Sequence, residues 1–192
     1  MSKKVKKKLS SVKECIKERL AVDNNKTFVI FKDRHVLFDP VTFKPLPGVE
    51  ELLSFLVKEN IDFALVSQDT YSFVSNNLRH TGLDSFFPEE IVFTKNRSEH
   101  EEEIFGNISN FAKKRMIKQE RLNHSYTSEI VNAVMHSQHS LDESILIDNC
   151  CEGVISAIFS NIEVAVVKVN YSAKDLAKIP PGYDYYTVNN VA

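Results

Sequence analysis

Apolar residues in the first 22 positions recur at the spacing of a helix. Five of them follow one another at intervals of four, three, four and four residues, which places them on one helical face: Val5, Leu9, Val12, Ile16 and Leu20. Lysines surround this apolar stripe. The pattern predicts a basic amphipathic helix over residues 1–22, distinct from a domain at residues 23–192. Such a helix either packs its apolar face on the domain or binds an anionic membrane surface or a partner.

From residue 27 onward, short apolar runs alternate with helical patterns. The runs predicted as strands are 27–31, 61–66, 91–93, 144–147 and 162–167, with 185–188 as a further, peripheral candidate. Apolar residues at helical spacing between them predict helices, most clearly from Val49 to Val57. This alternation predicts a Rossmann-like α/β domain with a central parallel sheet. Residues 96–124 break the rhythm, with acidic residues before basic ones, and are predicted to be a helical insertion.

Candidate functional residues follow from this sheet. Ligands bind such sheets at the carboxyl ends of strands, where the strand order reverses, so the residues after Phe31, Val66 and Ile147 are the first candidates. The sequence contains no GxGxxG or GxxxxGK phosphate loop. His136 and His139 share a helical face, but no third ligand is evident, and no metal site is predicted from them.

Composition narrows the class of protein. Hydrophobic residues make up 43% and charged residues 26% of the 192 positions, as is ordinary for one globular domain. A formal net charge of −2 argues against nucleic acid as a partner. No apolar run is long enough to span a bilayer, and the N-terminal lysines precede no apolar stretch of a secretory signal. The three cysteines form no CxxC pattern and indicate reduced thiols. These features predict a cytoplasmic protein and leave its oligomeric state open.

Three segments, taken in order, resemble the haloacid dehalogenase superfamily. They are 47–53, which opens with Pro-Gly; 63–67, which ends in serine; and 81–87, which contains Gly-Leu-Asp followed by two aromatic residues. Members of this family commonly have these features, and the resemblance covers nearly the whole chain from residue 27. It implies a phosphatase-like α/β fold, and we expect no large cap.

The first motif of that family, Phe-Asp-x-Asp-Gly-Thr/Val-Leu-Phe, is altered here. The corresponding stretch begins at Phe31 and reads FKDRHVLF, so Lys32 and Arg34 replace the aspartates and His35 replaces the glycine. In active relatives the first aspartate attacks phosphorus and the second is the general acid and base. Lysine offers no carboxylate nucleophile, and arginine shuttles no protons near neutral pH. Asp33 is the alternative carboxylate, but its side chain would face the other way if the strand continued to it.

The second and third motifs are matched unequally. Ser67 stands where the family uses a hydroxyl to bind phosphate, although a serine here also fits a buried or capping role. The family's third motif supplies a lysine, but Ser125 stands near that position. Lys95 or a lysine of the 96–124 segment is the alternative.

The fourth motif retains acidic residues. The family pattern is Gly-Asp-Ser-x-x-Asp after a strand, and its acids hold magnesium in active relatives. Asp148 and Glu152 match these acids. Magnesium there also needs the first-motif carboxylate, so Lys32 in its place implies that no cofactor is bound. We hypothesise that a Lys32–Asp148 ion pair, joined by Arg34 and Glu152, replaces the metal, because a dication and these cations would repel each other. Alternatively, Asp148 caps the following helix.

The leading interpretation is a catalytically inactive relative of these phosphatases that acts as a scaffold or regulatory subunit. It would bind a protein partner through the basic segment at 1–22 or the insertion at 96–124.

Two alternatives belong to other classes. One is a magnesium-dependent phosphatase that uses Asp33, Ser67 and Asp148. The other binds phosphate or a nucleotide without hydrolysis, in a cationic cleft formed by Lys32, Arg34 and Ser67.

Overall fold

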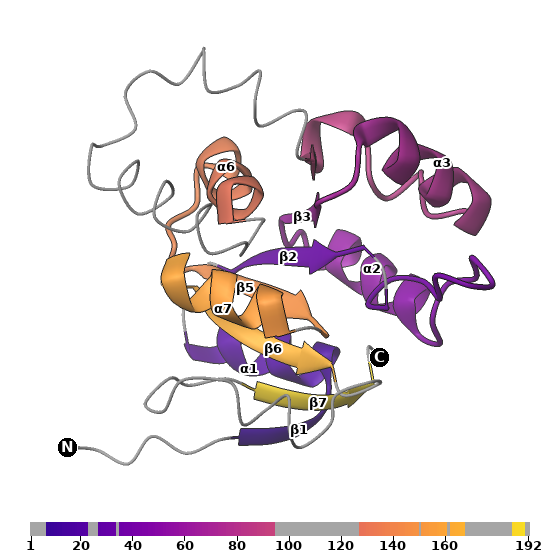
Figure 1. The fold of residues 1–192 in the computed structure, drawn as a ribbon. Coiled ribbons are helices and arrows are strands. Elements are labelled where there is room, and N and C mark those ends of the chain that lie inside the picture. Colours follow the sequence, from indigo (N-terminus) through magenta and orange to yellow (C-terminus); the bar gives the residue numbers. More distant parts are fainter. Residues whose placement is uncertain are drawn as a thin grey trace.

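The computed structural model describes residues 7–22, 27–33, 35–94, 127–149, 151–160, 162–167 and 186–190. In this part of the chain, the centre is a seven-stranded parallel sheet with the order β1-β7-β6-β5-β2-β3-β4 (Figure 1). The strands are β1 (Lys7–Ser11), β2 (Phe28–Lys32), β3 (Phe63–Ser67), β4 (Val92–Thr94), β5 (Ser144–Asp148), β6 (Glu163–Val167) and β7 (Tyr186–Asn190). The predicted Rossmann-like α/β fold with a central parallel sheet is confirmed.

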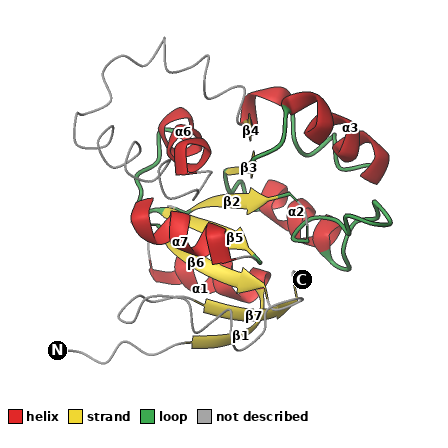
Figure 2. Cartoon of the chain, in the orientation of Figure 1, coloured by secondary structure: helices red, strands yellow, loops and turns green. Residues whose placement is uncertain are grey.

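Helices cover both faces of the sheet (Figure 2). One hydrophobic cluster joins residues of the first three helices to one face, and a second cluster joins residues of the last two to the opposite face. The helices are α1 (Val12–Val22), α2 (Val49–Lys58), α3 (Tyr71–Thr81), α6 (Thr127–Ser137) and α7 (Cys151–Ser160), with a short 3₁₀ turn at Glu89–Ile91. The result is a three-layer α/β/α arrangement.

Local sequence explains the central elements. Residues 28–31 of β2 are all buried, as expected for a parallel strand covered on both faces. Helix α2 turns its apolar stripe inward, from Val49 to Leu56. Helix α3 begins at a cap in which Thr70 accepts a hydrogen bond from the backbone of Phe73. It ends at Gly82, whose φ of 75° is left-handed backbone that favours glycine.

The N-terminal segment differs from its prediction. Residues 7–11 form strand β1, and the helix begins only at Val12, so the prediction of a helix over residues 7–11 is wrong. Leu9 pairs with Val188 of β7, which lies one position inside the sheet edge and is therefore not the peripheral strand that we expected. A partner strand far away in the sequence overrides the local helical spacing. Ile16 of α1 is fully buried in the core.

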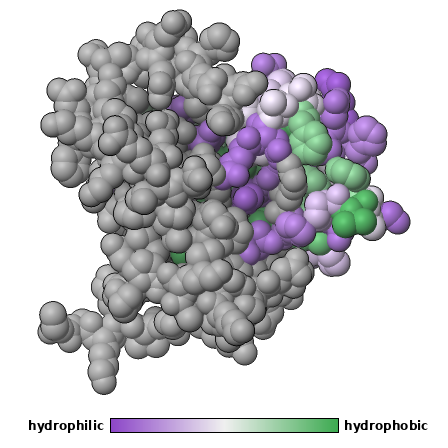
Figure 3. Space-filling model, in the orientation of Figure 1, coloured by the Kyte–Doolittle hydropathy of each residue, from purple (hydrophilic) through white to green (hydrophobic). Residues whose placement is uncertain are grey.

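Several predictions fall outside the described residues: the insertion at 96–124 and the positions of Lys95, Ser125 and Arg34. On the described surface that faces the viewer in Figure 3, hydrophilic residues predominate and hydrophobic patches are small. Among the described helices, none combines the length and the apolar character needed to cross a bilayer.

Candidate functional site

The strand order reverses between β2 and β5. From β2 the chain builds outward through β3 and β4, and it then returns to place β5 on the other side of β2. Such a switch point, at the carboxyl ends of the strands, is where open α/β sheets bind ligands. Phe31 pairs with Ile147, so the next positions along the two neighbouring strands are Lys32 and Asp148. The residues after Phe31 and Ile147 thus lie side by side at the carboxyl ends of β2 and β5, and ligand binding there stays a prediction.

Asp33 and Ser67 meet at this edge. The Ser67 hydroxyl donates a hydrogen bond of 2.7 Å to Oδ2 of Asp33, and the two residues are only 2% and 1% exposed. Ser67 Oγ also accepts a bond of 3.2 Å from the backbone N–H of Asp69. Our expectation that Asp33 turns away assumed that the strand continues, but β2 ends at Lys32. The alternation of side chains stops there, and the Asp33 carboxylate reaches the end of β3.

A tight turn follows Asp33. The backbone N–H of Leu37 donates to the carbonyl of Asp33, and that of His35 donates to the carbonyl of Phe38, each at 2.9 Å. His35 has a φ of 60°, the left-handed region that glycine adopts most easily. Histidine tolerates this region better than most side chains do. His35 stands where the family motif has its glycine, and its left-handed backbone is the conformation that a glycine there would adopt most easily.

The loop after this turn carries a second ordered carboxylate. Asp39 Oδ1 accepts hydrogen bonds from the backbone N–H groups of Thr42 and Val41, at 2.8 and 2.9 Å. These bonds, that of Thr42 first, hold the pKa of Asp39 below its usual value of 3.8. Phe38 and Pro45 close the loop through an antiparallel bridge. Its tip exposes the side chain of Val41, which is 83% accessible.

Asp148 ends β5 and is completely buried. Its Oδ1 accepts a bond of 2.5 Å from the backbone N–H of Asn149, just before α7. The side chains of Glu152 and Arg34 lie outside the described residues, so their part in the site stays a prediction. The Lys32–Asp148 ion pair likewise stays a prediction that the strand register permits.

Active relatives imply a magnesium ion at this edge, and the described residues fit it poorly. Asp33 and Asp148 follow neighbouring strands, but one oxygen of Asp33 already accepts the Ser67 hydroxyl. No group of three or more His, Cys, Asp or Glu side chains in the described ranges could hold a metal. Mg²⁺ completes its octahedron with water but still binds through one or two carboxylates, and Lys32 stands at the position of the first of these in active relatives. We therefore derive no chemical step through a metal.

Comparisons with known proteins give one family and one fold. The model of the haloacid dehalogenase-like hydrolase family matches residues 3–110. NagD from E. coli K-12 superposes with a TM-score of 0.62 at 13% identity, over 86% of this chain and 97% of that one. A 4-nitrophenylphosphatase from Thermotoga maritima gives 0.63 at 11% identity, over 86% and 95% of the two chains.

A third solved structure agrees with these two. A putative beta-phosphoglucomutase from Thermotoga maritima gives a TM-score of 0.62 at 12% identity, over 85% of this chain and 94% of that one. At such low identities these likenesses establish the fold alone. No curated protein matches the sequence.

Proposed function

The chain belongs to the haloacid dehalogenase-like hydrolase family, and we propose that it is a catalytically inactive member that acts by binding a protein partner. The observation that carries this proposal is the buried contact between Ser67 and Asp33. It occupies the carboxylate that stands nearest to the family's nucleophile position, which itself holds Lys32.

The family reaction depends on a nucleophile at the end of the first central strand. The left-handed turn at His35 supports the alignment that places Lys32 at the end of β2 in the position of the attacking aspartate. Covalent phosphoryl transfer needs an oxygen nucleophile there, and a lysine ammonium group has no lone pair with which to attack phosphorus. The family reaction therefore requires another carboxylate.

Asp33 is the nearest substitute, and its surroundings oppose attack. A nucleophile must meet the phosphorus in line at about 3 to 3.5 Å. Asp33 is 1% exposed, and its Oδ2 already accepts the hydroxyl of Ser67. A phosphate ester would have to displace this contact and open the site. We therefore expect the chain to be inactive towards phosphate esters.

Hydrolysis of a broad panel of phosphate esters with magnesium tests the inactivity. Wild type is compared with Asp33→Asn and Asp148→Asn, which keep the shape of each side chain and remove its charge. We expect the same background rate from all three proteins. Turnover in wild type that both variants lose would overturn the proposal. It would establish the second candidate, a phosphatase built on Asp33, Ser67 and Asp148, which is favoured by the position of all three residues at the carboxyl ends of the neighbouring strands β2, β3 and β5.

The partner-binding half needs a variant that leaves the core intact. Deleting residues 1–22 is unsuitable, because Val12 and Ile16 are fully buried and β1 pairs with β7. Replacing 96–124 with a glycine-serine linker of equal length changes none of the described residues. Affinity purification followed by mass spectrometry should recover a protein with wild type and Asp148→Asn but not with the linker variant. Identical recovery from all three would contradict the role of the insertion.

A further inference from the structure

A cavity of about 170 Å³ lies near the amino ends of the strands, opposite the carboxyl ends where Lys32 and Asp148 stand. It is bounded by the first residues of β2, the residues around the starts of β3 and β4, and the second half of α6. Buried side chains form its inner wall, and exposed ones stand at its rim. The wall includes Phe28, Ala64, Phe93 and Ala133, and the rim includes Asp62 and His136.

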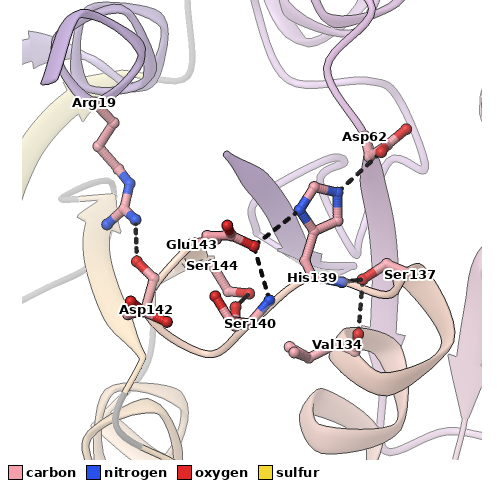
Figure 4. Close-up of polar contacts among 9 residues, drawn as sticks. All are labelled: Arg19, Asp62, Val134, Ser137, His139, Ser140, Asp142, Glu143 and Ser144. Atoms are coloured by element: carbon pink, nitrogen blue, oxygen red, sulfur yellow. Dashed lines mark hydrogen bonds and ion pairs between the residues drawn. The ribbon is translucent and has the colours of Figure 1, made fainter. Parts of the chain in front are cut away.

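The carboxylate at the rim is held in place by His139 (Figure 4). Nε2 of His139 lies 2.9 Å from Oδ2 of Asp62, and it must donate, because a carboxylate only accepts. Nδ1 of the same ring is 3.6 Å from Oε2 of Glu143. The ring also stacks on Phe28, with centroids 5.2 Å apart and planes inclined by 6°. Three neighbours thus fix His139, and through it one oxygen of Asp62.

The turn after α6 is braced by further hydrogen bonds. Oε2 of Glu143 accepts the backbone N–H of Ser140 at 2.9 Å, and the Ser137 hydroxyl donates to the carbonyl of Val134 at 2.8 Å (Figure 4). Ser137 Oγ also accepts a hydrogen bond of 3.4 Å from the backbone N–H of His139. A rim that is already ordered loses little conformational entropy when a ligand binds.

The chemistry of the cavity combines aromatic walls with negative charge. Phe28 and Phe93 are buried wall residues, and no residue that lines the cavity in the described ranges is lysine or arginine. The Asp62 side chain is 69% exposed, and the bond from His139 engages only its Oδ2. Its other oxygen faces an accessible rim, where a charged donor would form a strong, charge-assisted hydrogen bond.

We propose that this cavity binds a small planar cation, an amidinium group carried on a single aromatic ring. A cavity of roughly 150 Å³ is large enough to hold benzene, so the ring fits against Phe28 and Phe93 while the charged group reaches Asp62. Aromatic walls also favour a cation over a neutral ligand of the same shape. This site is independent of the proposed function, because it lies at the other edge of the sheet.

Methyl NMR of the full chain with ¹³C-labelled alanine tests the site, with benzamidine as the probe. The methyl groups of Ala64 and Ala133 line the cavity, whereas Ala157 is buried in the same hydrophobic cluster but outside the lining. We expect the first two signals to shift and that of Ala157 to stay. Neutral benzamide should bind at least tenfold more weakly, about 1.4 kcal/mol. No shift at about 10 mM benzamidine, ten times a Kd of about 1 mM, would overturn the proposal.

A pair of variants tests the carboxylate. Asp62→Asn removes the charge and should weaken benzamidine binding at least tenfold, about 1.4 kcal/mol. Asp84→Asn is the control and should bind benzamidine as wild type does. Asp84 is exposed, and its neighbour Leu83 belongs to the other core cluster, away from the cavity. Equal affinities for the two variants, or equal affinities of wild type for benzamidine and benzamide, would refute the proposal. Unchanged alanine spectra without ligand show that each variant is folded.

Discussion

Replacing Ser67 with alanine tests the buried contact on which the proposed function rests. The substitution removes the 2.7 Å hydrogen bond to Asp33 and the acceptor for the backbone of Asp69. A buried polar group that loses its partner costs about 1 to 3 kcal/mol. Since both Ser67 and Asp33 are within 2% of complete burial, water does not replace the lost bond readily. We expect the free energy of unfolding to fall by about 2 kcal/mol.

Urea denaturation measures this loss, and the m-value should stay constant if only stability changes. For a chain of this size, about 2 kcal/mol corresponds to a melting temperature lower by about 4 to 8 °C. Ser72→Ala is the control, since Ser72 is exposed on α3, and it should change stability by less than about 0.5 kcal/mol.

A double-mutant cycle isolates the Ser67–Asp33 pair from the other contacts of each residue. It combines Ser67→Ala with Asp33→Ala and compares the double variant with the two single ones. We expect a coupling energy of about 1 kcal/mol or more, as for residues in one hydrogen-bonded network. A coupling within about 0.3 kcal/mol of zero, the additivity of distant sites, would refute the contact and remove the main support for inactivity.

Three further predictions concern other parts of the fold. Arg19→Ala should lower the free energy of unfolding by about 2 kcal/mol in urea denaturation, because the buried guanidinium donates at 2.6 Å to the carbonyl of Asp142 at the approach to β5. The hydrogen bond and the charge of Lys13 lower the pKa of Glu51 from its usual value of 4.5. The pair therefore stabilises the fold above pH 4.5, and this contribution is lost as the pH falls through the lowered pKa. Lys13→Met should raise the pKa of Glu51 in an NMR titration. Gly82→Ala should lower the free energy of unfolding, measured by thermal melting, by about 1 kcal/mol. The cause is left-handed backbone strain alone, because an added Cβ meets no atom within 4 Å.

The sequence predicts the central sheet well because its signal is local. Residues 28–31 form an uninterrupted apolar run that is typical of a strand buried on both faces, and Val49 to Leu56 repeat at helical spacing. The carboxyl edge with Ser67 and Asp148 follows from the same runs, since each residue directly ends a strand. Features of this kind need no knowledge of distant contacts.

Features that depend on distant contacts escape such reasoning. Leu9 fits a helical stripe in sequence, but its place is set by Val188, at the other end of the chain. The orientation of Asp33 depends on a strand that stops one residue earlier, and strand ends are poorly defined by local pattern. His139 and Asp62 are 77 positions apart, and neither carries a motif that would link them.

The pairing of β1 with β7 determines when this part of the sheet can form during synthesis. Strand β1 (Lys7–Ser11) is synthesised before the other described strands, but its only neighbour in the described sheet is Tyr186–Asn190. Until residue 190 has been translated, β1 lacks its partner strand β7. The hydrophobic cluster around Ile16 of the adjoining helix likewise lacks Val188 of β7. At about 5 to 20 residues per second, this interval lasts on the order of ten seconds or more. During that time the nascent chain exposes an unpaired strand, a natural target for chaperones and for aggregation.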